Sequence, residues 1–322
     1  MALDAEALVD RRRLRRKLSF WRVLGILALV AAVVAIGASV ANRGAVPVGQ
    51  AHIARISVDG FIGGSDRMTE LMRRVGEARG VSGVVISINS PGGTTTGAEE
   101  LYRNIRRLAE KKPLVAFVDG TAASGGYITA LAADRIVARE TSLVGSIGVI
   151  LQYPQVSELL GKIGVQVEEV KSSPLKAEPS GYKPTSPEAR AALQQVVNDT
   201  YEWFRGLVAT RRNYNPAELN TVADGRVFNG RQALALKLVD ELGSERDAIA
   251  WLEREKGVTR DLPVRNWEPR SETDISLFTW AAGAADLFGF EGAARGLRQL
   301  GASADIAKLD GLLAVWHPAG EK

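Results

Sequence analysis

Residues 53–138 repeat one pattern that constrains the fold more than any other feature of the chain: a short apolar run, then a segment with helical periodicity. The apolar runs predict strands, at 53–58, 83–88, 114–118 and 135–138. The intervening segments predict helices, at 66–78, 97–111 and from 125 to about 133. Strands that alternate with helices form a parallel sheet with right-handed crossovers. The sequence therefore predicts an α/β domain.

The second half of the chain is less regular. Further elements are predicted after residue 138: short strands at 148–153 and 165–170, and helices at 155–161, 188–212 and 245–256. Residues 171–187 are rich in Ser, Pro, Gly and Lys and predict a long loop, a kind of segment that is often functional in a compact domain. Beyond Gly257 the pattern weakens, and we expect residues 258–322 to form a C-terminal extension of unknown role.

An uncharged segment at residues 23–42 predicts a membrane anchor. A helix of this length spans about 30 Å, the thickness of one bilayer core. Seven basic residues precede it: Arg11, Arg12, Arg13, Arg15, Arg16, Lys17 and Arg22. Such a cluster can bind nucleic acid. Directly before an apolar span, however, it fits the positive-inside rule, by which basic flanks of a membrane span stay in the cytoplasm, so we expect no nucleic-acid partner.

We therefore predict residues 1–22 as a basic cytoplasmic segment and 43–52 as a linker. The remainder would lie outside the cytoplasmic membrane. A cleaved signal peptide is the alternative, because Ser39-Val40-Ala41 has small residues at the positions of a cleavage site. Either interpretation places the rest of the chain outside the cytoplasm.

Ser124 lies in a glycine-rich run, Asp119–Tyr127, where a strand is expected to give way to a helix. Gly125 and Gly126 leave its hydroxyl unshielded, and a helix N-terminus favours a developing anion. This position is typical of a nucleophile, although it also suits a helix-capping serine.

A second glycine-rich run, Asn89–Gly93, ends a predicted strand, at the edge where open α/β sheets place their sites. The N–H groups of Gly93 and Gly125 would together suit an oxyanion hole. A simple turn also explains the run.

A serine nucleophile needs a base, and the sequence offers few. The chain has no cysteine and two histidines, His52 and His317, each near one end of the exported part. Lysine is the remaining common base when its charge is suppressed. The predicted loop and its surroundings offer Lys171, Lys176 and Lys183, and the chemistry alone does not choose among them.

Four motifs follow one another along the chain, Asn89–Gly93, Asp119–Tyr127, Leu143–Val149 and Lys171–Lys176. Together with residues 223–243 they resemble the short form of signal peptide peptidase A, over about residues 53–255. The resemblance implies the βαβ spiral fold of the Clp protease and crotonase group for a protease domain at 53–257. A helical C-terminal part and one N-terminal transmembrane helix complete the expected architecture.

The resemblance implies a serine endopeptidase with Ser124 as nucleophile and Lys176 as general base. It makes Lys171 structural or solvated. The supporting residues that it implies are Ser146 as hydrogen-bond partner of the lysine, Gly93 and Gly125 as oxyanion-hole donors, and Gly92 in the shaping of that turn. It implies no cofactor and no metal.

Members of this family cleave peptides with small or apolar side chains, such as signal peptides left in the membrane. They assemble into rings, and in the short form serine and lysine meet across neighbouring subunits. We therefore expect a homo-oligomer in the inner (cytoplasmic) membrane, held by residues 23–42, in which Ser124 and Lys176 of one chain are too far apart to bond.

Two other functions remain open on the sequence. One is an acyl-thioester enzyme of the crotonase type, which uses similar backbone donors. The other is an inactive membrane-bound scaffold.

Overall fold

The computed structural model describes Trp21, residues 50–269 and residues 313–315. The described residues from Gln50 onward belong to one compact unit, to which the following description applies. The predicted anchor at 23–42 lies outside the described residues. Within the ranges that are described, no helix is long and apolar enough to cross a membrane.

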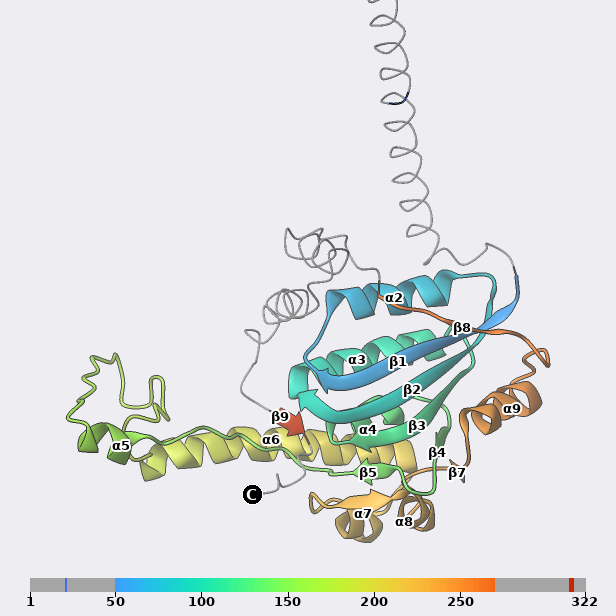
Figure 1. Ribbon diagram of the computed structural model, residues 1–322. Coiled ribbons are helices and arrows are strands. Elements are labelled where there is room, and N and C mark those ends of the chain that lie inside the picture. The colour runs from blue at the N-terminus through green and yellow to red at the C-terminus, as the bar shows by residue number, and fades with distance from the viewer. Residues whose placement is uncertain (1–20, 22–49, 270–312, 316–322) are drawn as a thin grey trace, which may run out of the picture. The chain divides into compact units, whose positions relative to one another are not determined.

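A mixed β-sheet forms the centre of the domain (Figure 1). Its main path runs β6-β5-β3-β2-β1-β8, and β4, β7 and β9 pair outside that path. The strands are β1 (His52–Ile62), β2 (Val81–Thr94), β3 (Leu114–Ala123), β4 (Ile136–Ala138), β5 (Leu143–Gly145), β6 (Val227–Asn229), β7 (Glu241–Leu242), β8 (Val264–Asn266) and β9 (Leu313–Val315). Strands β1, β2 and β3 are parallel, which confirms the predicted α/β class.

Helices cover both faces of the sheet. The helices are α2 (Asp66–Glu77), α3 (Thr95–Ala109), α4 (Gly125–Leu131), α5 (Ser157–Lys162), α6 (Pro187–Arg212), α7 (Pro216–Val222), α8 (Gly230–Ala235) and α9 (Glu245–Glu255). Val84 and Ile86 of β2 pack in the same buried cluster as α2, α3 and α4. Val85 faces the other way and packs with Trp251 and Leu252 of α9. Burial on both faces explains why β2 reads as a continuous apolar run rather than an alternating one.

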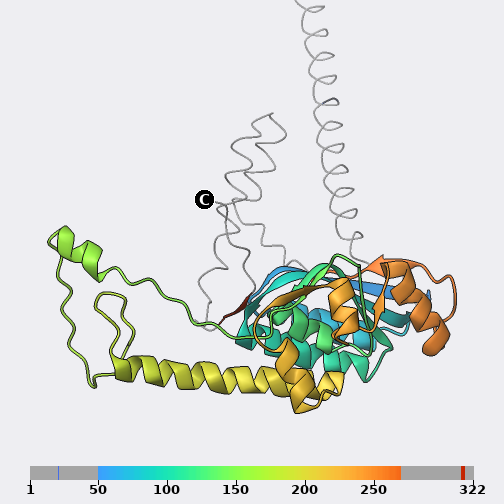
Figure 2. The ribbon, with the colours of Figure 1, turned by 90° about the horizontal axis from the view of Figure 1, so that it is seen from below.

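An arm, which we define as residues 151–186, leaves the sheet after β5 and returns through α6 (Figures 1 and 2). Helix α6 begins firmly, since Ser186 accepts a hydrogen bond from the Ala189 amide and Pro187 takes the first turn. Only its C-terminal half is anchored in the core, through Phe204 and Val208.

The strands predicted at 148–153 and 165–170 are wrong. Residues 165–170 form no strand, and Val165, Val167 and Val170 are exposed on the arm. Their alternation resembles that of a strand, but no strand in the described part of the chain pairs with these residues. The sequence pattern also missed β8, which continues the sheet beside Ile53 of β1.

Candidate functional site

Ser124 occupies a strained turn between β3 and α4. Its backbone has φ 53° and ψ −116°, a region that an L-residue enters at a cost of about 1–3 kcal/mol. The Ser124 amide donates to the Gly145 carbonyl at 2.7 Å, and its carbonyl accepts from the Tyr127 and Ile128 amides. Its hydroxyl makes no capping hydrogen bond, so the turn does not use the side chain as an N-cap. Strained strand-to-helix turns of this kind present nucleophilic serines in hydrolases.

Ser146 directly follows β5, the strand that pairs with the end of β3, just as Ser124 directly follows β3. Ala123 of β3 pairs with Gly145 of β5, so the two serines follow directly paired residues. Ser146 also has a left-handed backbone, with φ 52°, and its amide donates to the Arg226 carbonyl at 2.8 Å. The sheet register therefore places Ser146 beside Ser124, a proximity that the sequence alone does not give.

The run Asn89–Gly93 continues β2 instead of ending it. Gly93 pairs with Ile62, and a Cβ there would overlap the Ile62 carbonyl oxygen, so β1 and β2 approach each other only because residue 93 is glycine. Pairing between β2 and β3 runs to Ser90 opposite Ala122. Gly92 and Gly93 thus lie just beyond the last β2–β3 pair, as Ser124 does on its own strand.

Helix α4 packs closely against this end of β2. A Cβ on Gly126 would meet the Ser90 carbonyl oxygen at 2.6 Å. The two glycine-rich runs that we singled out in the sequence are therefore neighbours in space. An oxyanion hole formed by Gly93 and Gly125 would need these two runs to lie close together.

A strand from the far end of the chain pairs with the same glycines. Leu313, Ala314 and Val315 of β9 lie antiparallel to Thr94, Gly93 and Gly92, in that order. Since β1 takes one edge of β2 there, β9 takes the other edge, which β3 has left. This edge therefore accommodates an extended peptide.

Lys176 lies apart from these groups. It is exposed, in the loop between α5 and α6, which Figures 1 and 2 show at the end of the arm away from α4. Ala177 beside it also has a left-handed backbone, with φ 59°. The structure thus brings together Ser124, Ser146 and the glycines, but it does not bring Lys176 to them within one chain.

The other two candidate lysines are engaged in ion pairs. Lys171 and Lys183 each contact both Glu169 and Glu178, at 2.7–3.1 Å. Hydrogen bonds to these carboxylates raise the pKa of both lysines, which opposes a role as neutral base. Lys176 makes no ion pair within the described chain.

The histidine alternative finds no support in the described site. His52 is buried at the start of β1, where Nδ1 contacts the Gln50 carbonyl at 2.8 Å and Nε2 accepts from the Trp267 indole at 3.1 Å. Both ring nitrogens are thus occupied away from Ser124, and His317 lies outside the described residues. Over the described ranges no cluster of three or more His, Cys, Asp or Glu side chains could hold a metal.

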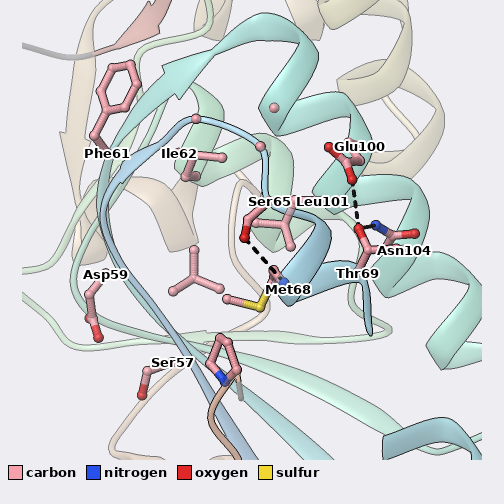
Figure 3. Close-up of a pocket in the computed structure, with 15 residues that line it drawn as sticks. Ser57, Asp59, Phe61, Ile62, Ser65, Met68, Thr69, Glu100, Leu101 and Asn104 are labelled. Atoms are coloured by element: carbon pink, nitrogen blue, oxygen red, sulfur yellow. Dashed lines mark hydrogen bonds between the residues drawn. The ribbon is translucent and has the colours of Figure 1, made fainter. Parts of the chain in front are cut away.

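A cavity of about 360 Å³ adjoins the β1 side of the site (Figure 3). Phe61, Ile62, Met68 and Leu101 give it an apolar wall, and Ile62 is the residue that pairs with Gly93. At the polar end, Thr69 donates to Glu100 at 2.7 Å and accepts from Asn104 at 2.8 Å. Sequence analysis did not predict this cavity, because its wall combines residues of β1, α2 and α3 that only the fold brings together.

Comparison with known proteins shows a consistent group of relatives. The model of peptidase family S49 matches residues 106–259. The chain is 38% identical over 210 residues to a putative protease of Synechocystis, covering 65% of this chain and 76% of that protein. It is 35% identical over 189 residues to the putative signal peptide peptidase SppA of Enterococcus faecium, with 58% and 55% covered. A third relative, the chloroplastic serine protease SPPA of Arabidopsis thaliana, is 35% identical over 188 residues, with 58% and 28% covered.

Proposed function

The chain belongs to peptidase family S49, and on that premise we propose that it is a membrane-anchored serine endopeptidase whose nucleophile is Ser124 and whose general base is Lys176. The observation that most supports this proposal is the strained backbone of Ser124 at the start of α4, which packs against the glycine-rich part of β2. Structures retain such strain mainly where a function depends on it.

The proposed reaction is peptide hydrolysis in two steps. The neutral amine of Lys176 takes the proton from the Ser124 hydroxyl, whose oxygen attacks the carbonyl carbon of the scissile bond. The N–H groups of Gly93 and Gly125 stabilise the oxyanion, each such donor being worth roughly 2.7–4 kcal/mol. The ammonium of Lys176 then protonates the leaving amine, and water releases the acyl group by the same route. Ser146 holds the lysine in position.

We further propose that Lys176 reaches Ser124 of a neighbouring copy, in a homo-oligomeric ring of Clp/crotonase-type domains. The arm supports this assembly because it projects from its own sheet (Figure 2) and because several of its apolar side chains are exposed. Leu159, Ile163 and Val170 are among them. Exposed apolar surface of this kind is typical of protein interfaces.

The proposed substrates are remnant signal peptides and similar short apolar peptides. The edge of β2 beyond its last pair with β3 supports an extended binding mode, because the strand β9 pairs there with Gly92–Thr94. The apolar residues 23–42 support anchoring in the cytoplasmic membrane with the catalytic domain outside, where cleaved signal peptides remain.

Peptide hydrolysis by four variants tests this function. Ser124→Ala and Lys176→Ala should each abolish cleavage, whereas Lys171→Ala should retain a measurable rate. Mixing the two inactive proteins should restore activity if the site is shared between chains. No recovery in the mixture would count against the shared site, and full activity of Lys176→Ala would exclude the proposed base.

Covalent labelling offers a second test. Labelling of Ser124 by an acylating serine inhibitor separates this peptidase from an acyl-thioester enzyme.

A further inference from the structure

A ring of four alternating charges closes the loop that holds Lys176. Lys171 contacts Glu169 at 2.8 Å and Glu178 at 2.7 Å. Lys183 contacts the same two carboxylates, at 3.1 and 2.7 Å. We call these four residues the charge ring. Lys176 lies between its members in sequence and takes no part in it.

The charge ring is better shielded than an ordinary surface ion pair. The side chain of Glu178 is 5% exposed and that of Lys171 is 14% exposed. Both lysines bond the same oxygen of Glu178, Oε1, while Oε2 is buried without a hydrogen-bond partner among the described residues. A half-satisfied buried carboxylate depends on its remaining contacts, so removing its charge should release the loop.

Short links connect Glu178 to Lys176. The Glu178 amide donates to the Leu175 carbonyl at 3.3 Å, and the Lys176 amide donates to the Ser173 carbonyl at 3.1 Å. Ala177, the single residue between them, has the left-handed backbone noted above. An L-residue adopts that conformation only when its surroundings impose it, and Glu178 is the nearest residue with strong tertiary contacts.

The rest of the arm holds the ring in place. The Val156 amide donates to the Gly181 carbonyl at 2.8 Å, and the hydroxyls of Tyr153 and Thr185 bond at 3.0 Å. The loop is therefore folded back on the first part of the arm, even though its tip is exposed. A flexible solvated loop would need neither the buried carboxylate nor these cross-links.

We propose that Glu178 is a positioning residue, which fixes the backbone at Lys176 through the charge ring so that the amine approaches the serine in one orientation. The inference rests on the proposed role of Lys176 as base. Hydrogen bonds from Lys171 and Lys183 also lower the pKa of Glu178 to about 2, so the ring is fully charged under the conditions of any peptidase assay.

A double-mutant cycle on the full-length protein tests this role. An activated ester is the substrate, because it leaves the Lys176→Ala variant a measurable residual rate. Glu178→Gln keeps the shape of the side chain and removes its charge. Displacement of a catalytic group by about 1 Å can cost about 100-fold. We therefore expect kcat to fall between tenfold and 100-fold, with KM changed less than threefold.

The cycle separates positioning from general destabilisation. If Glu178 acts through Lys176, adding Glu178→Gln to Lys176→Ala should leave the residual rate unchanged. An equal fall in both backgrounds would overturn the proposal, and so would an unchanged kcat in the single variant. Lys183→Met breaks the same ring from a half-exposed position and serves if Glu178→Gln fails to fold.

A matched control and a separate result protect the interpretation. Glu140→Gln breaks the exposed Arg231–Glu140 pair, 3.3 Å long and far from the arm in sequence, and should change kcat less than twofold. Full activity of Lys176→Ala would refute the base itself. An inactive Lys176→Ala together with a fully active Glu178→Gln would refute only the positioning role.

Discussion

Replacement of Ser124 by glycine should stabilise the protein while removing its activity. With φ 53° and ψ −116°, serine pays about 1–3 kcal/mol of backbone strain at this turn, whereas glycine adopts the conformation freely. Glycine costs about 0.5–1 kcal/mol in backbone entropy, so the net gain should be about 1 kcal/mol. For a domain of this size, that gain raises the melting temperature by about 2–4 °C.

Thermal unfolding of three variants measures this effect. Ser124→Ala is the reference, because it also lacks the hydroxyl but keeps the Cβ that causes the strain. Ser124→Gly should melt above it by about 2–4 °C. Ala122→Gly, at a buried position of the same strand with an ordinary φ, should melt below the wild type. If glycine at 124 melted below alanine, the strained turn would not exist and the main argument for Ser124 as nucleophile would fail.

Three further results are expected. Gly93→Ala should unfold the protein or abolish activity without a change at Ser124, because the Cβ of alanine would overlap the Ile62 carbonyl oxygen. Circular dichroism and Ser124 labelling would detect either effect, and a fully active variant would contradict the close approach of β1 to β2 at residue 93. Ending the chain before residue 313 should raise kcat/KM for short peptides, since β9 no longer occupies the edge of β2, and an unchanged value would mean that substrates do not use this edge. The melting temperature of wild type should exceed that of Glu178→Gln by a constant amount above about pH 5, and this difference should shrink as the pH falls towards 2. The reason is that the pKa of Glu178 is lower in the folded protein than in the unfolded chain. A difference independent of pH down to about 2.5 would show that the charge of Glu178 does not stabilise the fold.

The central sheet could be predicted from the sequence because its strands carry clear apolar patterns. Strands β2 and β3, buried on both faces, give nearly continuous apolar runs, and β1 gives an alternating one. The end of β2 could not be predicted, because Pro91 and two glycines resemble a turn. Only the approach of Ile62 to Gly93 reveals the role of these glycines, and that approach depends on tertiary register.

The candidate site was predictable in part. Ser124 and the glycines are marked by local composition, but the position of Ser146 beside Ser124 follows from the pairing of Ala123 with Gly145. The strand predicted at residues 165–170 is wrong because alternation reports only that apolar side chains point to one side. It does not report whether a partner strand exists to pair with them. The local sequence around Lys176 does not determine how its amine would reach Ser124, so its role as base remains a proposal.

The exposed arm has a consequence for how such an enzyme responds to its own abundance. Apolar side chains such as Ile163 and Val170 favour association, and association obeys mass action. If a complete site needs residues from two chains, specific activity falls as the protein is diluted below the dissociation constant of the assembly. If the proposed membrane anchor also holds, confinement to a membrane raises the local concentration of the chains. The anchored enzyme would then be active at cellular amounts that leave the detached domain monomeric and inactive.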